Sequence, residues 1–134
     1  MKWIKASLPF LLLLLLAMAC QSDNPYKQGE ILYLNFCSNC HMDNGAGLGE
    51  LIPPVAQSDY LANHQSNIAC LIKYGMEGEI VVNGKTYNQP MPAVPQLNDV
   101  EITNVINYLN HAWGNDLGTV RLQDVQQQLE QCVK

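Results

Sequence analysis

Two cysteines and a histidine within five consecutive residues constrain this 134-residue chain more than any other feature. Cys37, Cys40 and His41 have the spacing C-x-x-C-H, the attachment signature of a c-type haem. On a helical turn, positions 37 and 40 share one face and position 41 lies beside it. The alternatives are a thioredoxin-like C-x-x-C or half of a zinc site, but neither a second C-x-x-C nor a parallel-strand pattern accompanies the motif. We therefore expect one covalent haem c on both cysteines, with His41 as an axial iron ligand.

The first 19 residues have the pattern of a secretory signal peptide. A basic start precedes an apolar run from Leu8 to Ala19 that is too short to span a bilayer. Ala17 and Ala19 suit ordinary signal peptidase, whereas small residues before Cys20 resemble a bacterial lipobox, although Ala17 stands where leucine is usual. We favour lipidation of Cys20, because an exported thiol at a mature N-terminus has no evident use without acyl chains.

Residues 20–25 would then be a short tether on the periplasmic side of a bacterial membrane, and a soluble periplasmic protein is the alternative. The cysteine count supports lipidation of Cys20, because five is an odd number and an unpaired cysteine in an oxidising compartment needs an explanation. With Cys20 carrying lipid and the haem motif using two more, Cys70 and Cys132 remain.

A disulfide between Cys70 and Cys132 is expected from helical geometry. In a helix over residues 66–76, the apolar side chains, including Met76, share one arc and Cys70 points nearly opposite to it. The C-terminal segment can cover Cys70, because its apolar residues recur at helical spacing and Cys132 lies on the same stripe. A bridge closing roughly 60 residues would stabilise the fold by about 4 kcal/mol in the loop-entropy model.

The mature chain is acidic and of modest size. About 115 residues are enough for one domain with a single core, much of which a haem would supply. Without Lys2 and Lys5, five basic residues face 12 acidic ones, a formal charge of −7. This balance disfavours nucleic-acid binding and is compatible with a basic docking surface on a protein partner.

Hydrophobic spacing predicts an all-α haem domain over residues 26–114, followed by a helical extension over residues 115–134. The first helix runs from Tyr26 to His41, so the haem motif ends it. Gly29 inside that helix costs about 1 kcal/mol relative to alanine, which makes sense if another helix approaches its backbone closely.

A last core helix and a small hairpin are the other expected elements. Asn98 and Glu101 fit a capping box at the start of the helix that follows Leu97, and Gly114 ends it. Residues 79–87 are predicted to form a β-hairpin, because Asn83 is followed by glycine between two β-prone runs.

The second axial ligand separates electron transfer from gas or peroxide chemistry. Met91 is the best candidate, because prolines on both sides keep it out of a helix and let a loop aim its thioether. Met42 is adjacent to the proximal histidine, and Met76 is expected in the core. His64 and His111 lie in a surface stretch and late in a packed helix, so a bis-histidine site is disfavoured.

These residues together resemble the class I cytochromes c from Tyr26 to Trp113. The family has a glycine and an aromatic residue eight and four residues before the first haem cysteine, matched by Gly29 and Tyr33. An aliphatic-x-x-aromatic pair in the final helix is matched by Val105 and Tyr108. The resemblance implies three to five short helices around one haem, here with a small hairpin and an added C-terminal helix.

The resemblance also implies contacts around the haem. A proline carbonyl accepts the ring N–H of the proximal histidine in this family, and Pro53 is our match, with Pro54 as the alternative. Asn83, Tyr87 and Asn88 are candidate donors to the haem propionates or to the methionine sulfur. The chain departs from the family at Met42, where glycine is frequent.

Three functions are compatible with these features. The first is an electron carrier with His41 and Met91 on the iron, exchanging electrons with redox proteins such as a membrane-bound oxidase or a quinol-oxidising complex. The second is a haem enzyme or gas sensor, which would need an open iron position and a polar distal group. The third is a thiol oxidoreductase, which would need free sulfurs at Cys37 and Cys40. We favour a monomeric electron carrier without catalytic residues of its own.

Overall fold

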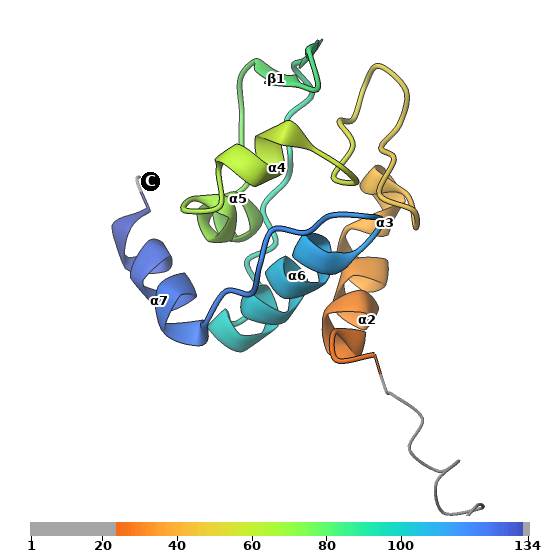
Figure 1. Ribbon diagram of the computed structural model, residues 1–134. Helices are drawn as coiled ribbons and strands as arrows, with labels where there is room; N and C mark the ends of the chain where they lie inside the picture. The colour runs from red at the N-terminus through yellow and green to blue at the C-terminus, as the bar shows by residue number, and fades with distance from the viewer. Residues whose placement is uncertain (1–23, 133–134) are drawn as a thin grey trace, which may run out of the picture.

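The computed structural model describes residues 24–132 as a set of short helices with one small hairpin (Figure 1). The elements are α2 (Lys27–Phe36), α3 (Ser38–His41), α4 (Asp59–Asn63), α5 (Ile68–Tyr74), β1 (Ile80–Val82), β2 (Lys85–Tyr87), α6 (Asp99–His111) and α7 (Leu122–Gln131). The expected all-α fold with a hairpin and an added C-terminal helix is confirmed. The predicted signal peptide and Cys20 lie outside the described residues.

Helices α2 and α6 cross at close range, and this crossing explains the glycine in the first helix (Figure 1). A Cβ atom at Gly29 would collide with the Asn104 carbonyl oxygen and would lie 2.7 Å from Cβ of Tyr108. Tyr33, from the next turn of α2, is fully buried, and its ring centroid lies 5.5 Å from that of Tyr108 and 5.0 Å from that of Trp113. The crossing thus fixes the helix that leads into the haem motif.

The capping box predicted for the last core helix is present at the start of α6. The Asn98 side chain accepts from the backbone N–H groups of Val100 and Glu101, and the Glu101 carboxylate accepts from the Asn98 N–H. The helix ends at His111, three residues before the predicted glycine. The first predicted helix is broken, because the backbone leaves helical geometry at Cys37 between α2 and α3.

Helix α5 ends earlier than the sequence predicts. It stops at Tyr74, where Gly75 takes a positive φ of 77° that favours glycine. Met76 is therefore outside the helix and not on its apolar stripe. It pairs instead with Met91 in an isolated antiparallel bridge. The hairpin that follows has the predicted turn, with Asn83 and Gly84 both at positive φ.

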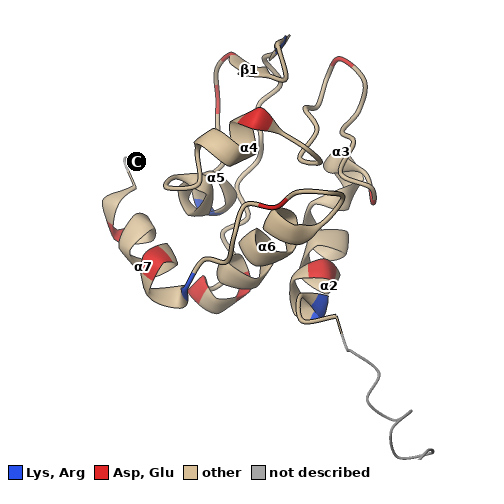
Figure 2. Ribbon diagram, viewed as in Figure 1, with Lys and Arg blue, Asp and Glu red and all other residues tan. Residues whose placement is uncertain are grey.

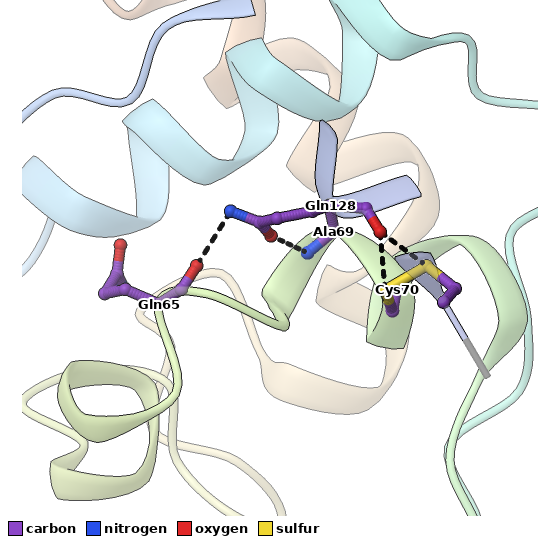
Figure 3. Close-up of a disulfide and its surroundings, with 5 residues drawn as sticks. Gln65, Ala69, Cys70 and Gln128 are labelled. Carbon is purple, nitrogen blue, oxygen red and sulfur yellow. Dashed lines mark hydrogen bonds between the residues drawn. A yellow bond between two sulfur atoms is a disulfide. The ribbon is translucent and has the colours of Figure 1, made fainter. Parts of the chain in front are cut away.

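The C-terminal extension packs on α5 and α6 and shares their core (Figure 1). Val125 of α7 is fully buried in the same apolar cluster as the α6 residues. Cys70 and Cys132 are joined by a disulfide across a separation of 62 residues. Beside it, Gln128 donates to the Gln65 carbonyl and accepts from the Ala69 N–H, as Figure 3 shows. This end of the molecule is tied down by a covalent bond and by an amide that bridges two backbone segments.

Within residues 24–132, none of the helices combines the length and the apolar character needed to cross a bilayer.

Candidate haem site

His41 is oriented by a backbone carbonyl brought back by the following loop. Its Nδ1 atom lies 3.0 Å from the Pro53 carbonyl oxygen. A carbonyl can only accept, so Nδ1 carries the proton and Nε2 keeps a free lone pair. Gly47 makes this approach possible, because a Cβ atom there would lie 2.6 Å from the Pro53 oxygen. Pro53, rather than the neighbouring Pro54, makes this contact.

Burial keeps the proximal histidine in the form that a metal needs. Desolvation lowers the pKa of His41, and the hydrogen bond to Pro53 opposes this only in part. The neutral imidazole is the form that coordinates iron. Burial likewise raises the pKa of the Cys37 thiol to about 11, with a smaller contribution from Cys40.

Met91 lies in a loop that is held by main-chain hydrogen bonds to α5 and to Met76, just after that helix. Its N–H and C=O both bond to Met76 at 2.9 Å. Gly75 allows this pairing, because a Cβ atom there would lie 2.5 Å from the Met91 oxygen. Beyond Met91, the Val94 N–H bonds to the Ile72 carbonyl at 3.0 Å, so the methionine loop follows α5 over several residues.

The side chains of His41 and Met91 line the same hollow. One part of it, the inner part, is lined by core residues such as Tyr33, Ile72 and Val105, and a second, outer part shares His41 and Met91 with it. Cys37 lines the inner part and Cys40 the outer part. The other walls of the inner part are almost entirely apolar: Val55, Leu61, Ile68, Leu71, Ile72, Ile80, Val82, Val105 and Leu109.

The lining fits a haem held at both cysteines. Cys37 and Cys40 would hold the macrocycle, and an apolar ring system suits these walls. The hydroxyl groups in the inner part already have partners. Tyr33 donates to the Met42 carbonyl at 2.6 Å, and Ser58 accepts from the Leu61 N–H at 3.1 Å. The Tyr60 hydroxyl donates to the Met76 sulfur at 3.5 Å.

The three predicted polar donors of the hairpin region lie in different settings. Tyr87 lines the outer part of the hollow and is 6 % exposed. The Asn83 amide instead donates to the Gln57 carbonyl at 3.2 Å, and its oxygen accepts from the Asp59 N–H at 3.0 Å. Asn83 thus ties the hairpin to the start of α4. Asn88 is exposed and is not among the residues that line either part of the hollow.

The two other histidines lie away from the hollow. The His64 ring stacks on Tyr60 at 3.8 Å between centroids, and its Nδ1 lies 2.8 Å from the Tyr60 carbonyl. The His111 ring stacks on Tyr26 at 4.2 Å. Neither residue lines either part of the hollow. The sequence arguments against a bis-histidine site agree with this placement.

The family model for cytochrome c matches residues 26–113. This chain belongs to the cytochrome c family. The match covers every residue placed around the hollow so far, from Tyr33 to Leu109. Membership implies a covalently bound c-type haem, which the two thiols and the apolar walls can accommodate.

Curated relatives agree with this assignment. Cytochrome c-552 of Thermus thermophilus is 37 % identical over 110 residues, which cover 79 % of this chain and 70 % of that protein. The cytochrome c subunit of a quinone-dependent alcohol dehydrogenase from Gluconobacter oxydans is 30 % identical over 102 residues, 73 % of this chain but only 21 % of that subunit. A gluconate 2-dehydrogenase cytochrome c subunit from Pantoea cypripedii is 29 % identical, over 81 % of this chain and 25 % of that subunit.

These relatives place the chain among haem-bearing electron carriers.

The structure also adds residues that sequence reasoning missed, namely Tyr60 and the Met76 backbone. Nothing in the local sequence around Tyr60 marks it as part of the hollow, since α4 is only five residues long. Gly75 is the sequence signal that could have placed Met76 outside α5, because glycine commonly ends a helix.

Proposed function

We propose that this cytochrome c is an electron carrier whose iron is bound by His41 and Met91. The observation that carries the proposal is that both side chains line one apolar hollow, with the free Nε2 of His41 left available by the bond from Nδ1 to Pro53. A bound haem supplies a one-electron Fe(III)/Fe(II) couple. Imidazole and thioether together favour a site that changes oxidation state without exchanging ligands.

The protein's own residues contribute position and environment. Pro53 orients the His41 ring and raises its basicity as a ligand. The apolar walls exclude water, which disfavours the extra positive charge of the oxidised state. The main-chain bonds from Met76 to Met91 hold the thioether loop in place during electron transfer. No residue of the hollow is needed as a general acid or base for this function.

The ligand assignment is tested by Met91→Leu, which keeps an apolar side chain of similar volume. We expect the sulfur-to-iron absorption band of the oxidised protein to weaken strongly and the reduced protein to gain weak carbon monoxide binding. Met42→Leu is the matched control and should leave both properties unchanged. Carbon monoxide binding by the unmodified reduced protein would contradict the proposal and favour the gas sensor or haem enzyme. A negative haem stain after denaturing electrophoresis would favour the thiol oxidoreductase.

We further propose that Cys20 carries a lipid that anchors the protein at the periplasmic face of a bacterial membrane. Residues 21–25 would separate the acyl chains from α2 by about 17 Å at full extension. The haem hollow would therefore stay close to the membrane. Cys20→Ala should move the protein from the membrane fraction to the soluble fraction. Recovery of the unmodified protein in the soluble fraction would instead support ordinary signal-peptidase cleavage.

The proposed partners are redox proteins, either a membrane-bound oxidase or a quinol-oxidising complex. Two relatives named as dehydrogenase cytochrome c subunits add a dehydrogenase as a partner class to test. Acidic residues are spread over several elements while basic ones are few, as Figure 2 shows, which suits a basic partner surface. Purification from detergent-solubilised membranes should recover a redox complex, and faster reduction at low salt should accompany it. An electron-transfer rate independent of salt would count against this docking.

A further inference from the structure

The hollow contains a second thioether beside the one proposed as the ligand. Met76 and Met91 exchange both main-chain hydrogen bonds, at 2.9 Å each, so they are directly opposite each other in an antiparallel bridge. Side chains at directly opposite positions point to the same face of the two strands. Both residues accordingly line both parts of the hollow, together with His41. A thioether other than that of Met91 therefore faces the same space.

The two sulfur atoms differ in what they contact. The Met76 sulfur accepts the Tyr60 hydroxyl at 3.5 Å, whereas Tyr60 makes no such bond to the Met91 sulfur. A thioether accepts a hydrogen bond through the same lone pairs that bind a metal. Tyr60 is itself fixed, because its ring stacks on His64 and its carbonyl accepts from His64. The Tyr60 hydroxyl thus engages the Met76 sulfur and not that of Met91.

The Met76 sulfur could exchange the Tyr60 hydroxyl for the iron without a rearrangement of the main chain. The bridge and the bond from Val94 to the Ile72 carbonyl hold both backbones, so the sulfur can move by rotation about the side-chain bonds alone. Methionine is unbranched and adapts readily to such movement. A methionine that only fills a core gap would need neither a hydroxyl partner nor a position opposite the ligand.

We propose that Met76 is a reserve axial ligand, held away from the iron by the Tyr60 hydroxyl and able to bind it when the Met91 sulfur is absent. The inference rests on the proposed function, since it assumes that Met91 is the ordinary ligand. It gives the hollow two alternative thioethers besides the imidazole of His41. Loss of Met91 would then leave the iron position largely closed to external ligands.

The test compares the haem-loaded variants Met91→Ala, Met91→Ala with Met76→Leu, and Met91→Ala with Tyr60→Phe. We expect Met91→Ala to retain a weakened sulfur-to-iron band that the added Met76→Leu abolishes. If Met76 fills the position nine-tenths of the time, the reduced Met91→Ala protein binds carbon monoxide about tenfold more weakly than the Met76→Leu double variant. Removing the Tyr60 hydroxyl should weaken carbon monoxide binding further.

The outcomes separate the inference from the proposed function. If Met91→Ala and the double variant with Met76→Leu have the same spectrum and the same carbon monoxide affinity, Met76 is not a reserve ligand, while Met91 remains the ligand. If Met76→Leu alone abolishes the sulfur band and Met91→Ala keeps it at full strength, both proposals are wrong. Far-ultraviolet circular dichroism of each variant monitors folding, and Met42→Leu in the Met91→Ala background serves as the control methionine change.

Discussion

The two walls of the hollow are built from contacts of very different range. In the histidine wall, residues 37–56, the His41 ring bonds to the Pro53 carbonyl across 12 residues. The main chain of this segment turns back at Gly45 and Gly47. The methionine wall, residues 71–97, is closed by contacts of longer range. Lys73 donates to the carbonyls of Pro95 at 2.9 Å and Leu97 at 2.6 Å, and α5 is joined to α7 by the disulfide across 62 residues. The contacts cited for the methionine wall join residues farther apart in the sequence than the bond from His41 to Pro53, so disturbances should affect the walls unequally.

Breaking the disulfide should give the largest difference between the walls. Cys70→Ser with Cys132→Ser removes a link that spans 62 residues, and we expect the free energy of unfolding to fall by about 4 kcal/mol in the loop-entropy model. In a urea titration, the sulfur-to-iron absorption band should disappear at a lower urea concentration than the helical circular dichroism signal. Cys132→Ser alone should have nearly the full effect. Simultaneous loss of both signals would mean that the methionine wall is no more dependent on α7 than the rest of the fold.

Gly29→Ala should disturb the entry to the histidine wall. Helix propensity favours alanine by about 1 kcal/mol, but the new Cβ would collide with the Asn104 carbonyl of α6. The collision should dominate, because a backbone atom cannot rotate away, and we expect a net loss of about 3 kcal/mol in stability. Gln28→Ala, at an exposed position of the same helix, is the control and should change the urea midpoint little. A stabilised Gly29→Ala variant would show that α2 and α6 pack less closely than described.

Lys73→Met should loosen the methionine wall alone. It removes a charged donor from two carbonyls, at a cost of about 2 kcal/mol. Lys85→Met is the matched control, because that lysine makes a solvent-exposed ion pair with Glu50 worth no more than about 0.5 kcal/mol. The midpoint temperature for loss of the sulfur-to-iron band should fall in the first variant and stay nearly constant in the second. Equal shifts would remove the special role given to the Lys73 contacts.

Met42→Gly should strengthen the histidine wall slightly. Met42 has φ 63° and ψ 158°, a region that is costly for any residue except glycine. We expect a gain of about 1 kcal/mol in unfolding free energy, after allowing for the greater entropy of an unfolded glycine. Met42→Ala should bring no such gain, since alanine also has a Cβ atom. Equal stability of the two variants would indicate that the strain at this position is negligible.

The sequence predicts the locally encoded parts of the fold well. The capping box at Asn98 and Glu101 and the hairpin turn at Asn83 depend on residues within a few positions of each other, and both are present. Pro53 lies within hydrogen-bonding distance of His41, as the family resemblance implies. The break at Cys37 was missed, because helical spacing alone continues through it.

Long-range contacts explain what the sequence could not predict. Apolar spacing predicts that α5 continues to Met76. In the structure Met76 instead forms a β-bridge with Met91, which lies 15 residues further along the chain. The Asn83 amide was expected near the haem, yet it donates to Gln57, and only the folded arrangement of the hairpin and α4 brings those groups together. The position of Tyr60 likewise depends on where α4 packs. The ligand roles of His41 and Met91 and the lipid at Cys20 remain predictions.

The burial of Cys37 has a consequence for how the cysteines are sorted during maturation. A thiol whose pKa is about 11 is almost wholly protonated near neutral pH, and the thiolate is the species that attacks disulfides. While Cys70 and Cys132 become oxidised, Cys37 would therefore exchange slowly with them. The fold itself would discourage mispairing and keep this sulfur available for the porphyrin.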